Sequence, residues 1–312
     1  MEPCFKAHRS PRVEVVGKVI RELAEGIVVR SFSKTNLVLP ADRDWTGLLL
    51  CETRGRLRLG RNRIYTGDRV LFRPGDGGRG RIEEVRPRTT ILFRPPVANV
   101  EQAVLVFAAA EPDPSRLLLD RLLLVAAVAG IRPVICLNKM DLGAEDFSLY
   151  RDLGYPVLTA SARTGEGLSQ LAQRLRGKVS ILIGPSGVGK SSLLNALDHD
   201  RRLPTGEVSS KLGRGRHTTR WVEILPVGDG LVADSPGFTS LELHDIPSGE
   251  LAGFFPEMAA LVGSCRYAGC LHRREPGCAV RASVGETVDR LRYDHYLFFF
   301  AECVKEDNPW SK

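Results

Sequence analysis

The stretch GPSGVGKSS, from Gly184 to Ser192, decides the fold of this 312-residue chain. It fits the pattern GxxxxGK[ST] at every fixed position. The apolar run 179–182 before it has the character of a buried strand, and the residues after it have a helical pattern as far as Leu197. Glycines in such a loop let successive backbone N–H groups point at one phosphate chain, and the helix start adds its dipole. Strand, loop and helix in this order predict a phosphate-binding loop in an α/β domain.

Two side chains of this loop have predicted roles of their own. Lys190 is expected to reach the β and γ phosphates of a nucleotide, and the Ser191 hydroxyl is expected to ligate Mg²⁺ within an octahedral shell of oxygens. The residues of the loop expected to contact the nucleotide are Gly184, Pro185, Ser186, Gly187, Val188, Gly189, Lys190, Ser191 and Ser192.

A second motif, NKMD from Asn138 to Asp141, follows the apolar run 133–137. Ligands of open α/β sheets bind at the carboxyl ends of the strands, where these polar residues would lie. Asp141 is predicted to accept hydrogen bonds from guanine N1–H and N2–H₂, and adenine offers neither donor. Because unmatched buried polar groups make such discrimination large, the two motifs together predict GTP rather than ATP as the ligand.

The residues around this aspartate complete the predicted base site. Asn138 is expected to brace the loop, and Lys139 is expected to lie along the base. The backbone contact to guanine O6 is expected from the segment TASA, through Ser161 and Ala162. The full predicted set is Asn138, Lys139, Met140, Asp141, Ser161 and Ala162.

The order of the two motifs is informative, because NKMD precedes the phosphate loop and an ordinary small GTPase carries them the other way round. Both halves of one nucleotide site are present, so the chain termini of the domain must lie in a different loop, and the original termini must be connected to each other. The sequence therefore predicts a circularly permuted GTPase domain, whose chain leaves the switch loops toward another domain.

Two downstream loops are predicted to serve as the switches. Asp234 of DSPG follows a short apolar strand and is expected to hold Mg²⁺, directly or through water, and Gly237 is expected to contact the γ phosphate through its backbone N–H. In the segment RGRHTTR, either Thr218 or Thr219 is expected to close over the metal, and the sequence does not distinguish them.

The group that positions the attacking water is not evident. Phe238 follows DSPG where many GTPases have a glutamine, so intrinsic hydrolysis is expected to be slow and to depend on help. His217 is a candidate to orient the water or take its proton. The alternatives for His217 are a contact to phosphate or RNA, and a solvated position in the loop.

Positive charge is concentrated in the N-terminal third of the chain. Residues 1–98 hold 20 lysines or arginines and 11 acidic residues, a net of +9, whereas the remaining residues hold 24 and 26, a net of −2. The segments Gly55–Arg63, Gly67–Phe72 and Gly77–Val85 combine strand-like stretches with glycine turns. We therefore expect an OB-type β-barrel, and its arginines favour folded RNA as the partner over a merely solvated surface.

Near the other end, three cysteines and a histidine form the pattern C-x₄-C-x-H-x₅-C within fourteen residues, namely Cys265, Cys270, His272 and Cys278. Three thiolates and one imidazole complete a tetrahedral zinc site with no open position, which indicates a structural rather than a catalytic metal. Disulfides are the alternative, but the cysteine count of seven is odd and neither a signal peptide nor a long apolar span is evident. No membrane association is expected.

The resulting predicted organisation is multidomain. It consists of an N-terminal tail (1–13), an OB-fold RNA-binding domain (14–94), a circularly permuted α/β P-loop GTPase domain (95–243), and a mainly helical zinc-binding domain with C-terminal helices (244–312).

Taken together, the motif order NKMD, TASA, GPSGVGKSS, GRGRHTT and DSPG, the barrel segments RGRLR, GDRV and RPPVANVEQ, and the cysteine–histidine spacing resemble the circularly permuted small-ribosomal-subunit biogenesis GTPases of bacteria, the RsgA or YjeQ type. The resemblance covers almost the whole chain. It implies a cytoplasmic, monomeric enzyme that hydrolyses GTP to GDP and phosphate. It also implies activation by the 30S subunit and its 16S rRNA, and action late in 30S maturation that includes release of an assembly factor.

Two other readings remain open at this stage. One is an RNA-binding GTPase that acts on the large subunit or on another RNA. The other is an RNA-binding module in which the nucleotide serves only as a structural ligand, in which case GTP and GDP would bind equally well.

Overall fold

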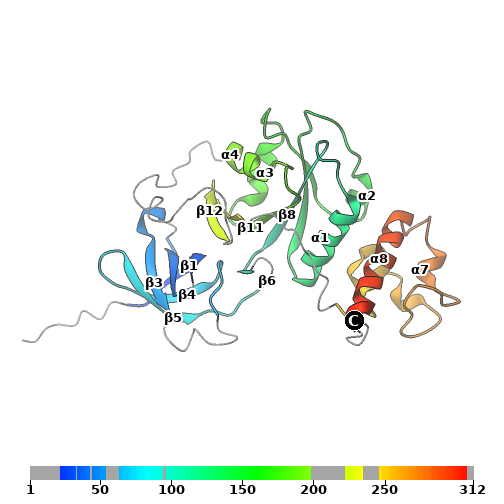
Figure 1. The fold of residues 1–312 in the computed structure, drawn as a ribbon, viewed down its shortest axis with the longest axis horizontal. Helices are drawn as coiled ribbons and strands as arrows, with labels where there is room; N and C mark the ends of the chain where they lie inside the picture. The colour runs from blue at the N-terminus through cyan, green and yellow to red at the C-terminus, as the bar shows by residue number, and fades with distance from the viewer. Residues whose placement is uncertain are drawn as a thin grey trace, which may run out of the picture.

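The computed structural model describes residues 22–32, 34–42, 44–53, 63–93, 96–197, 222–234 and 246–307. The segments with the predicted switch residues His217, Thr218, Thr219 and Gly237 lie outside these ranges, as does nearly all of Gly55–Arg63. Figure 1 shows a barrel, a central sheet with helices, and a helical C-terminal part arranged in this order along the molecule.

Five strands close the N-terminal barrel: β1 (Ala24–Ser31), β2 (Thr35–Pro40), β3 (Leu49–Thr53), β4 (Arg69–Pro74) and β5 (Arg79–Val85). The antiparallel pairs are β1–β2, β2–β3, β4–β5 and β1–β4, and β3 pairs with β5 in parallel. Alternate residues of these strands point inward, so Val28, Val38 and Phe72 are buried in one small core. This five-stranded closure confirms the predicted OB-type barrel.

Six strands of a continuous eleven-stranded sheet, which also includes the barrel strands, form the centre of the molecule. These six strands lie in the order β10 (Val157–Thr159), β9 (Arg132–Asn138), β8 (Gln102–Ala108), β11 (Val179–Ile183), β13 (Gly230–Asp234) and β12 (Glu223–Val227). The first five are parallel, and β12 pairs with β13 in the antiparallel direction. Every residue of β8 and β11 is buried, as expected for strands covered on both faces.

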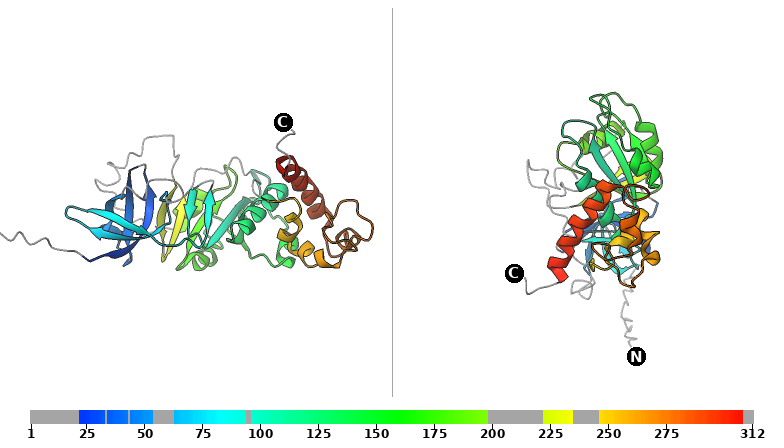
Figure 2. Two further views of the ribbon diagram at one scale, coloured as in Figure 1. Left: turned by 90° about the horizontal axis from the view of Figure 1, so that it is seen from below. Right: turned by 90° about the vertical axis from the view of Figure 1, so that its right-hand side faces the viewer.

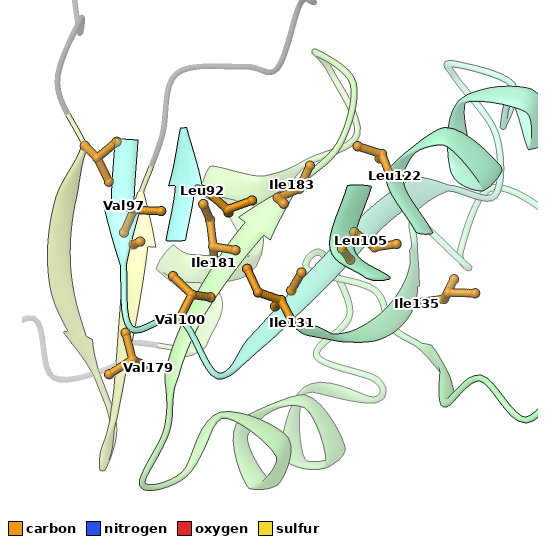
Figure 3. Packing of buried hydrophobic residues seen from close by; sticks show 14 of the residues in the cluster. Leu92, Val97, Val100, Leu105, Leu122, Ile131, Ile135, Val179, Ile181 and Ile183 are labelled. Carbon is orange, nitrogen blue, oxygen red and sulfur yellow. The ribbon is translucent and has the colours of Figure 1, made fainter. Parts of the chain in front are cut away.

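Helices cover the two faces of this sheet: α1 (Arg116–Val128), α2 (Ser148–Asp152), α3 (Leu168–Leu175) and α4 (Lys190–Leu197). The alternation of β8 sorts its side chains between two clusters. Leu105 packs with Leu122 of α1, and Val106 belongs to the cluster that contains Leu171 of α3 and Leu193 of α4. Figure 3 shows Leu105, Leu122 and Ile181 in the first cluster.

The ends of α1 follow from its sequence. The side chain of Ser115 accepts a hydrogen bond from the Leu118 backbone N–H at 3.2 Å and caps the first turn. Gly130 follows the helix with a φ of 66°, the left-handed conformation that ends helices. Ser115 and Gly130 therefore set the start and the end of α1.

The barrel and the central sheet share a core, which the division of the sequence into modules did not predict. Strand β1 pairs with β12 at Arg30 and Glu223, and Thr66 donates a buried hydrogen bond to the Val222 carbonyl at 3.1 Å. Val29 of the barrel belongs to the same apolar cluster as the residues of the central sheet. A two-stranded ribbon of β6 (Ile91–Phe93) and β7 (Pro96–Ala98) leads from one part to the other.

The C-terminal part is built from short helical segments and one long helix. They are η4 (Leu251–Phe254), α6 (Pro256–Ala259), η5 (Val262–Ser264), α7 (Ala279–Ala282) and α8 (Arg290–Asp307). The expectation of short helices and a closing helix is confirmed. In the parts of the chain that the structure describes, no helix is both long and apolar enough to span a bilayer.

Buried charges join α8 to α1, which Figures 1 and 2 show side by side. The Arg292 guanidinium, 2% exposed, donates through Nη1 to Asp120 of α1 at 2.6 Å and through Nε to Glu257 at 2.7 Å. His295 Nδ1 lies 2.5 Å from the other oxygen of Asp120. Nearby, both terminal nitrogens of Arg121 bind the Glu302 carboxylate. The C-terminal part is thereby fixed to the central sheet by ion pairs as well as by apolar contacts.

Candidate nucleotide site and metal-ligand cluster

The phosphate-loop sequence lies between the end of β11 at Ile183 and the start of α4 at Lys190, at the carboxyl edge of the sheet. A Cβ atom on Gly184 would lie 2.0 Å from the Val106 carbonyl oxygen, so only glycine fits there. Gly189 has a φ of 91°, and a Cβ on it would lie 2.3 Å from Asn138 Nδ2. The two glycines thus let the loop lie directly against β8 and the NKMD segment.

Lys190 points back into this loop. Its ammonium donates hydrogen bonds to the carbonyl oxygens of Gly184 and Pro185, both at 2.7 Å. Partial burial lowers the pKa of Lys190, and the charge of Asp234 opposes that shift. Strand β13 is parallel to β11 and ends at Asp234, which places this carboxylate at the same edge of the sheet as Ser191. The cation and the carboxylate expected around a metal-bound phosphate therefore lie at the same edge of the sheet.

Asn138 holds three segments of the site together. The residue is 1% exposed, and its side-chain Nδ2 donates a hydrogen bond to the Val188 carbonyl oxygen at 2.8 Å. Its Oδ1 accepts from the Ala162 backbone N–H at 3.1 Å. The phosphate loop, the NKMD segment and the TASA segment are thus linked by one buried amide. Lys139 has a φ of 61°, and its ammonium binds the Glu111 carbonyl.

Asp141 presents its carboxylate to a cavity of about 330 Å³. Ser161 Oγ donates to Oδ1 at 2.5 Å, and Arg163 Nε lies 2.7 Å from Oδ2. The hydrogen bond from Ser161 and the charge of Arg163 lower the pKa of Asp141, which keeps it an ionised acceptor at neutral pH. The cavity is lined by Asn138, Lys139, Asp141, Leu142, Ala162, Arg163, Gly189 and Ser192.

Two lining residues, Leu142 and Arg163, were missed in the sequence. Each directly follows a segment that was recognised, since Leu142 comes after NKMD and Arg163 after TASA. That adjacency was the available signal. Met140 is half-buried against the core of the central sheet rather than in the lining of the cavity. The predicted individual roles of the loop residues in binding nucleotide stay predictions.

The four predicted metal ligands lie together in the C-terminal part. The ligand atoms of Cys265, Cys270, His272 and Cys278 are all within 4.8 Å of one another. His272 Nδ1 is 3.5 Å from Cys265 Sγ and 3.4 Å from Cys278 Sγ. Tetrahedral zinc with bonds of about 2.3 Å to sulfur and 2.0 Å to nitrogen would set such atoms roughly 3.5 Å apart. The group could therefore hold a metal ion, and the two sulfur–nitrogen distances match that spacing.

Backbone hydrogen bonds shape the turn that carries these ligands. Burial opposes ionisation of Glu275, but its carboxylate accepts the backbone N–H groups of Leu271, Arg273 and Arg274, and they lower its pKa to about 2. From the other side, Tyr293 of α8 donates its hydroxyl hydrogen to the His272 carbonyl at 2.8 Å. The ligand-bearing turn is thus held in place by protein groups outside the four-residue cluster.

Comparison with known proteins places this architecture in a family. The family model described as RsgA GTPase matches residues 85–244, which contain the NKMD segment, the phosphate loop and β13. Relatives from Moorella thermoacetica and Geobacillus kaustophilus, both named small ribosomal subunit biogenesis GTPase RsgA, are 48% and 47% identical. Each alignment covers 92% of this chain, and it covers 100% and 99% of the relative, respectively. This chain belongs to the RsgA GTPase family.

Solved structures of the family have the same fold. The crystal structure of YloQ, described as a circularly permuted GTPase, is 36% identical with a TM-score of 0.76, and 94% of this chain and 98% of that chain are covered. YjeQ from Thermotoga maritima is 35% identical with a TM-score of 0.75, over 91% and 99%. The predicted circular permutation and the resemblance are confirmed, and the chain is a GTPase that converts GTP to GDP and phosphate.

Proposed function

We propose that this GTPase is a late maturation and checkpoint factor of the 30S ribosomal subunit, whose hydrolysis is stimulated by the subunit and helps to release an assembly factor. One observation carries the proposal. Relatives named for biogenesis of the small ribosomal subunit align over their whole length with 92% of the chain, barrel and C-terminal part included. A shared nucleotide domain alone would not extend through both flanking parts.

In this proposal the domains divide at 1–13, 14–94, 95–243 and 244–312, with the barrel as the RNA-binding domain. Its exposed residues Arg79 and Arg81 alternate along β5 and therefore share one face, which suits contacts to the phosphates of 16S rRNA. The protein acts as a cytoplasmic monomer that cycles between GTP and GDP.

The nucleotide occupies the carboxyl edge of the central sheet. Asp141, Ser161 and Ala162 contact the base, the phosphate loop and Gly237 contact the phosphates, and Mg²⁺ is held by Ser191, by Asp234 directly or through water, and by Thr218 or Thr219. Lys190 neutralises charge that develops on the phosphates. His217 remains the candidate for orienting the attacking water.

In the C-terminal domain we assign a structural Zn²⁺ to Cys265, Cys270, His272 and Cys278. The donor set of three thiolates and one imidazole and the spacings of 3.4 and 3.5 Å support zinc. All four positions of a tetrahedral ion are then filled by protein atoms, so this metal supplies stability and no reacting ligand.

The contacts of β12 suggest how the barrel senses the nucleotide. Strand β12 follows the predicted first switch in the chain, and it pairs with β13, after which the predicted second switch begins. The Thr66–Val222 hydrogen bond ties the barrel to the residue just before β12. A conformational change of the switches between the GTP and GDP states would therefore alter the orientation of the barrel, and with it the affinity of the barrel for RNA.

Stimulation by the ribosomal subunit tests this proposal. GTP turnover is expected to be slow in the isolated protein and clearly faster with purified 30S subunits, because RNA contact would order the switches. Mature 50S subunits serve as the control. Equal turnover with and without 30S would contradict the proposal, and stimulation by 50S alone would favour a role on the large subunit.

A single substitution tests the assignment of the base site. Asp141→Asn replaces one acceptor oxygen by an amide donor, so that the bidentate pair with guanine N1–H and N2–H₂ cannot form. GDP affinity measured by calorimetry is expected to fall about ten- to one-hundred-fold, the range for loss of a charge-assisted hydrogen bond. The matched control is Asp146→Asn, on an exposed carboxylate that only bonds to Ser148. Unchanged GDP affinity in Asp141→Asn would remove Asp141 from the base site.

A further inference from the structure

Arg163 is a charged residue of the base cavity to which neither the motifs nor the catalytic scheme gives a task. We propose that Arg163 occupies the guanine-reading carboxylate of Asp141 in the nucleotide-free protein, and that guanine must displace it to bind. Arg163 then determines how readily the base enters the site. This inference rests on the proposed role of Asp141 and goes beyond it.

The pair has the geometry of a direct charge-assisted hydrogen bond. Arg163 Nε lies 2.7 Å from Asp141 Oδ2, a short distance for a charge-assisted hydrogen bond. The two side chains differ in exposure, with 72% for Arg163 and 10% for Asp141. The guanidinium therefore lies on the solvent side of the carboxylate, which is the side from which a base approaches.

Ser161 and Arg163 bind the same carboxylate with different consequences. Ser161 is fully buried and holds Oδ1 from within the protein, so its hydrogen bond is compatible with a second donor at that oxygen. Guanine offers two parallel donors and needs both oxygens from the open side. Its N–H groups can reach Oδ2 only after the exposed guanidinium has moved away.

Competition of this kind predicts a measurable cost to binding. Because the guanidinium is 72% exposed, solvent screens the pair and its contribution to stability is small. The effect of Arg163 on guanosine affinity should therefore be about two- to five-fold.

Guanosine affinity separates competition from long-range attraction, because guanosine is uncharged and is not steered by a nearby cation. Arg163→Met keeps an apolar stem of similar length and removes only the guanidinium. We expect it to bind guanosine about two- to five-fold more tightly than the native protein in an NMR titration at low salt, and the difference should shrink as salt screens the pair. Arg176→Met is the matched control, since Arg176 forms an exposed pair with Asp229 outside the cavity.

A second measurement follows the displacement directly. The side-chain Nε–H signal of Arg163, assigned by its loss in Arg163→Met, is expected to shift when GDP is added and to stay in place when ADP is added. Equal or weaker guanosine binding by Arg163→Met, or an Nε–H signal unmoved by saturating GDP, would overturn the inference. Absence of guanosine and GDP binding in the native protein would instead overturn the proposed base site.

Discussion

Replacing Cys278 with alanine is expected to abolish binding of the proposed Zn²⁺ and to unfold the C-terminal part around the ligand-bearing turn. The ligands Cys270 and Cys278 belong to the apolar core that includes Phe299 of α8, and most other residues near the cluster lie in turns or single helical turns. Structural zinc contributes about 10–16 kcal/mol to folding in zinc-finger peptides, comparable to the whole stability of a domain at about 5–15 kcal/mol. The hydrogen bonds of Glu275 and Tyr293 also hold this turn, but at roughly 1–3 kcal/mol each they are not expected to replace the metal.

Zinc content by mass spectrometry and hydrogen exchange of residues 262–285 measure this effect. Cys303→Ala is the matched control, because Cys303 is fully buried in the same apolar core but outside the ligand cluster. It should keep one equivalent of zinc and normal protection from exchange. Full zinc occupancy in Cys278→Ala would contradict the assignment of the site, and zinc loss without faster exchange would show that the metal does not stabilise the fold.

Arg292→Met is expected to destabilise the protein by about 3–5 kcal/mol, the cost of breaking a buried ion pair and leaving its partner unpaired. The guanidinium of Arg292 donates to Asp120 through Nη1 and to the two oxygens of Glu257 through Nε and Nη2. Burial opposes its charge, but the bonds to Glu257 and the charges of both acids raise the pKa of Arg292 above its usual value. Methionine fills much of the space but removes the guanidinium from two buried carboxylates, of which Asp120 keeps its contact with His295.

Urea unfolding of the zinc-loaded protein measures the loss. The control Arg290→Met removes the exposed pair with Asp294 one turn away, whose side chains are 76% and 51% exposed, and should cost less than about 1 kcal/mol. A similar small loss in both variants would mean that the cluster between α1 and α8 does not stabilise the fold. A separate early transition in Arg292→Met would show that the C-terminal part detaches first.

Local patterns in the sequence were sufficient for the central elements and for the ligand cluster. The apolar runs 133–137 and 179–182 predicted β9 and β11, because both strands are covered on two faces. The cysteine–histidine spacing likewise brought four ligands together within a short segment. In each case the structural rule acts over a few residues.

Long-range contacts could not be predicted in this way. The Arg292–Asp120 pair joins residues 172 positions apart, and the pairing of β1 with β12 depends on how two separately recognisable parts dock. Arg163 was missed for a different reason. An arginine next to a motif is usually solvated, and only the position of Asp141 in three dimensions shows that the two side chains meet.

The docking of the barrel against β12 also bears on solubility. An antiparallel strand at the end of a sheet presents unpaired backbone groups on which another chain can add. Here β1 of the barrel pairs with the edge strand β12, and Val29, Leu37 and Leu39 cover apolar residues next to it. A shortened protein that began after the barrel would expose the edge strand β12 and the apolar surface beside it, and would tend to self-associate. The barrel thus also shields the nucleotide-binding part from association with other chains.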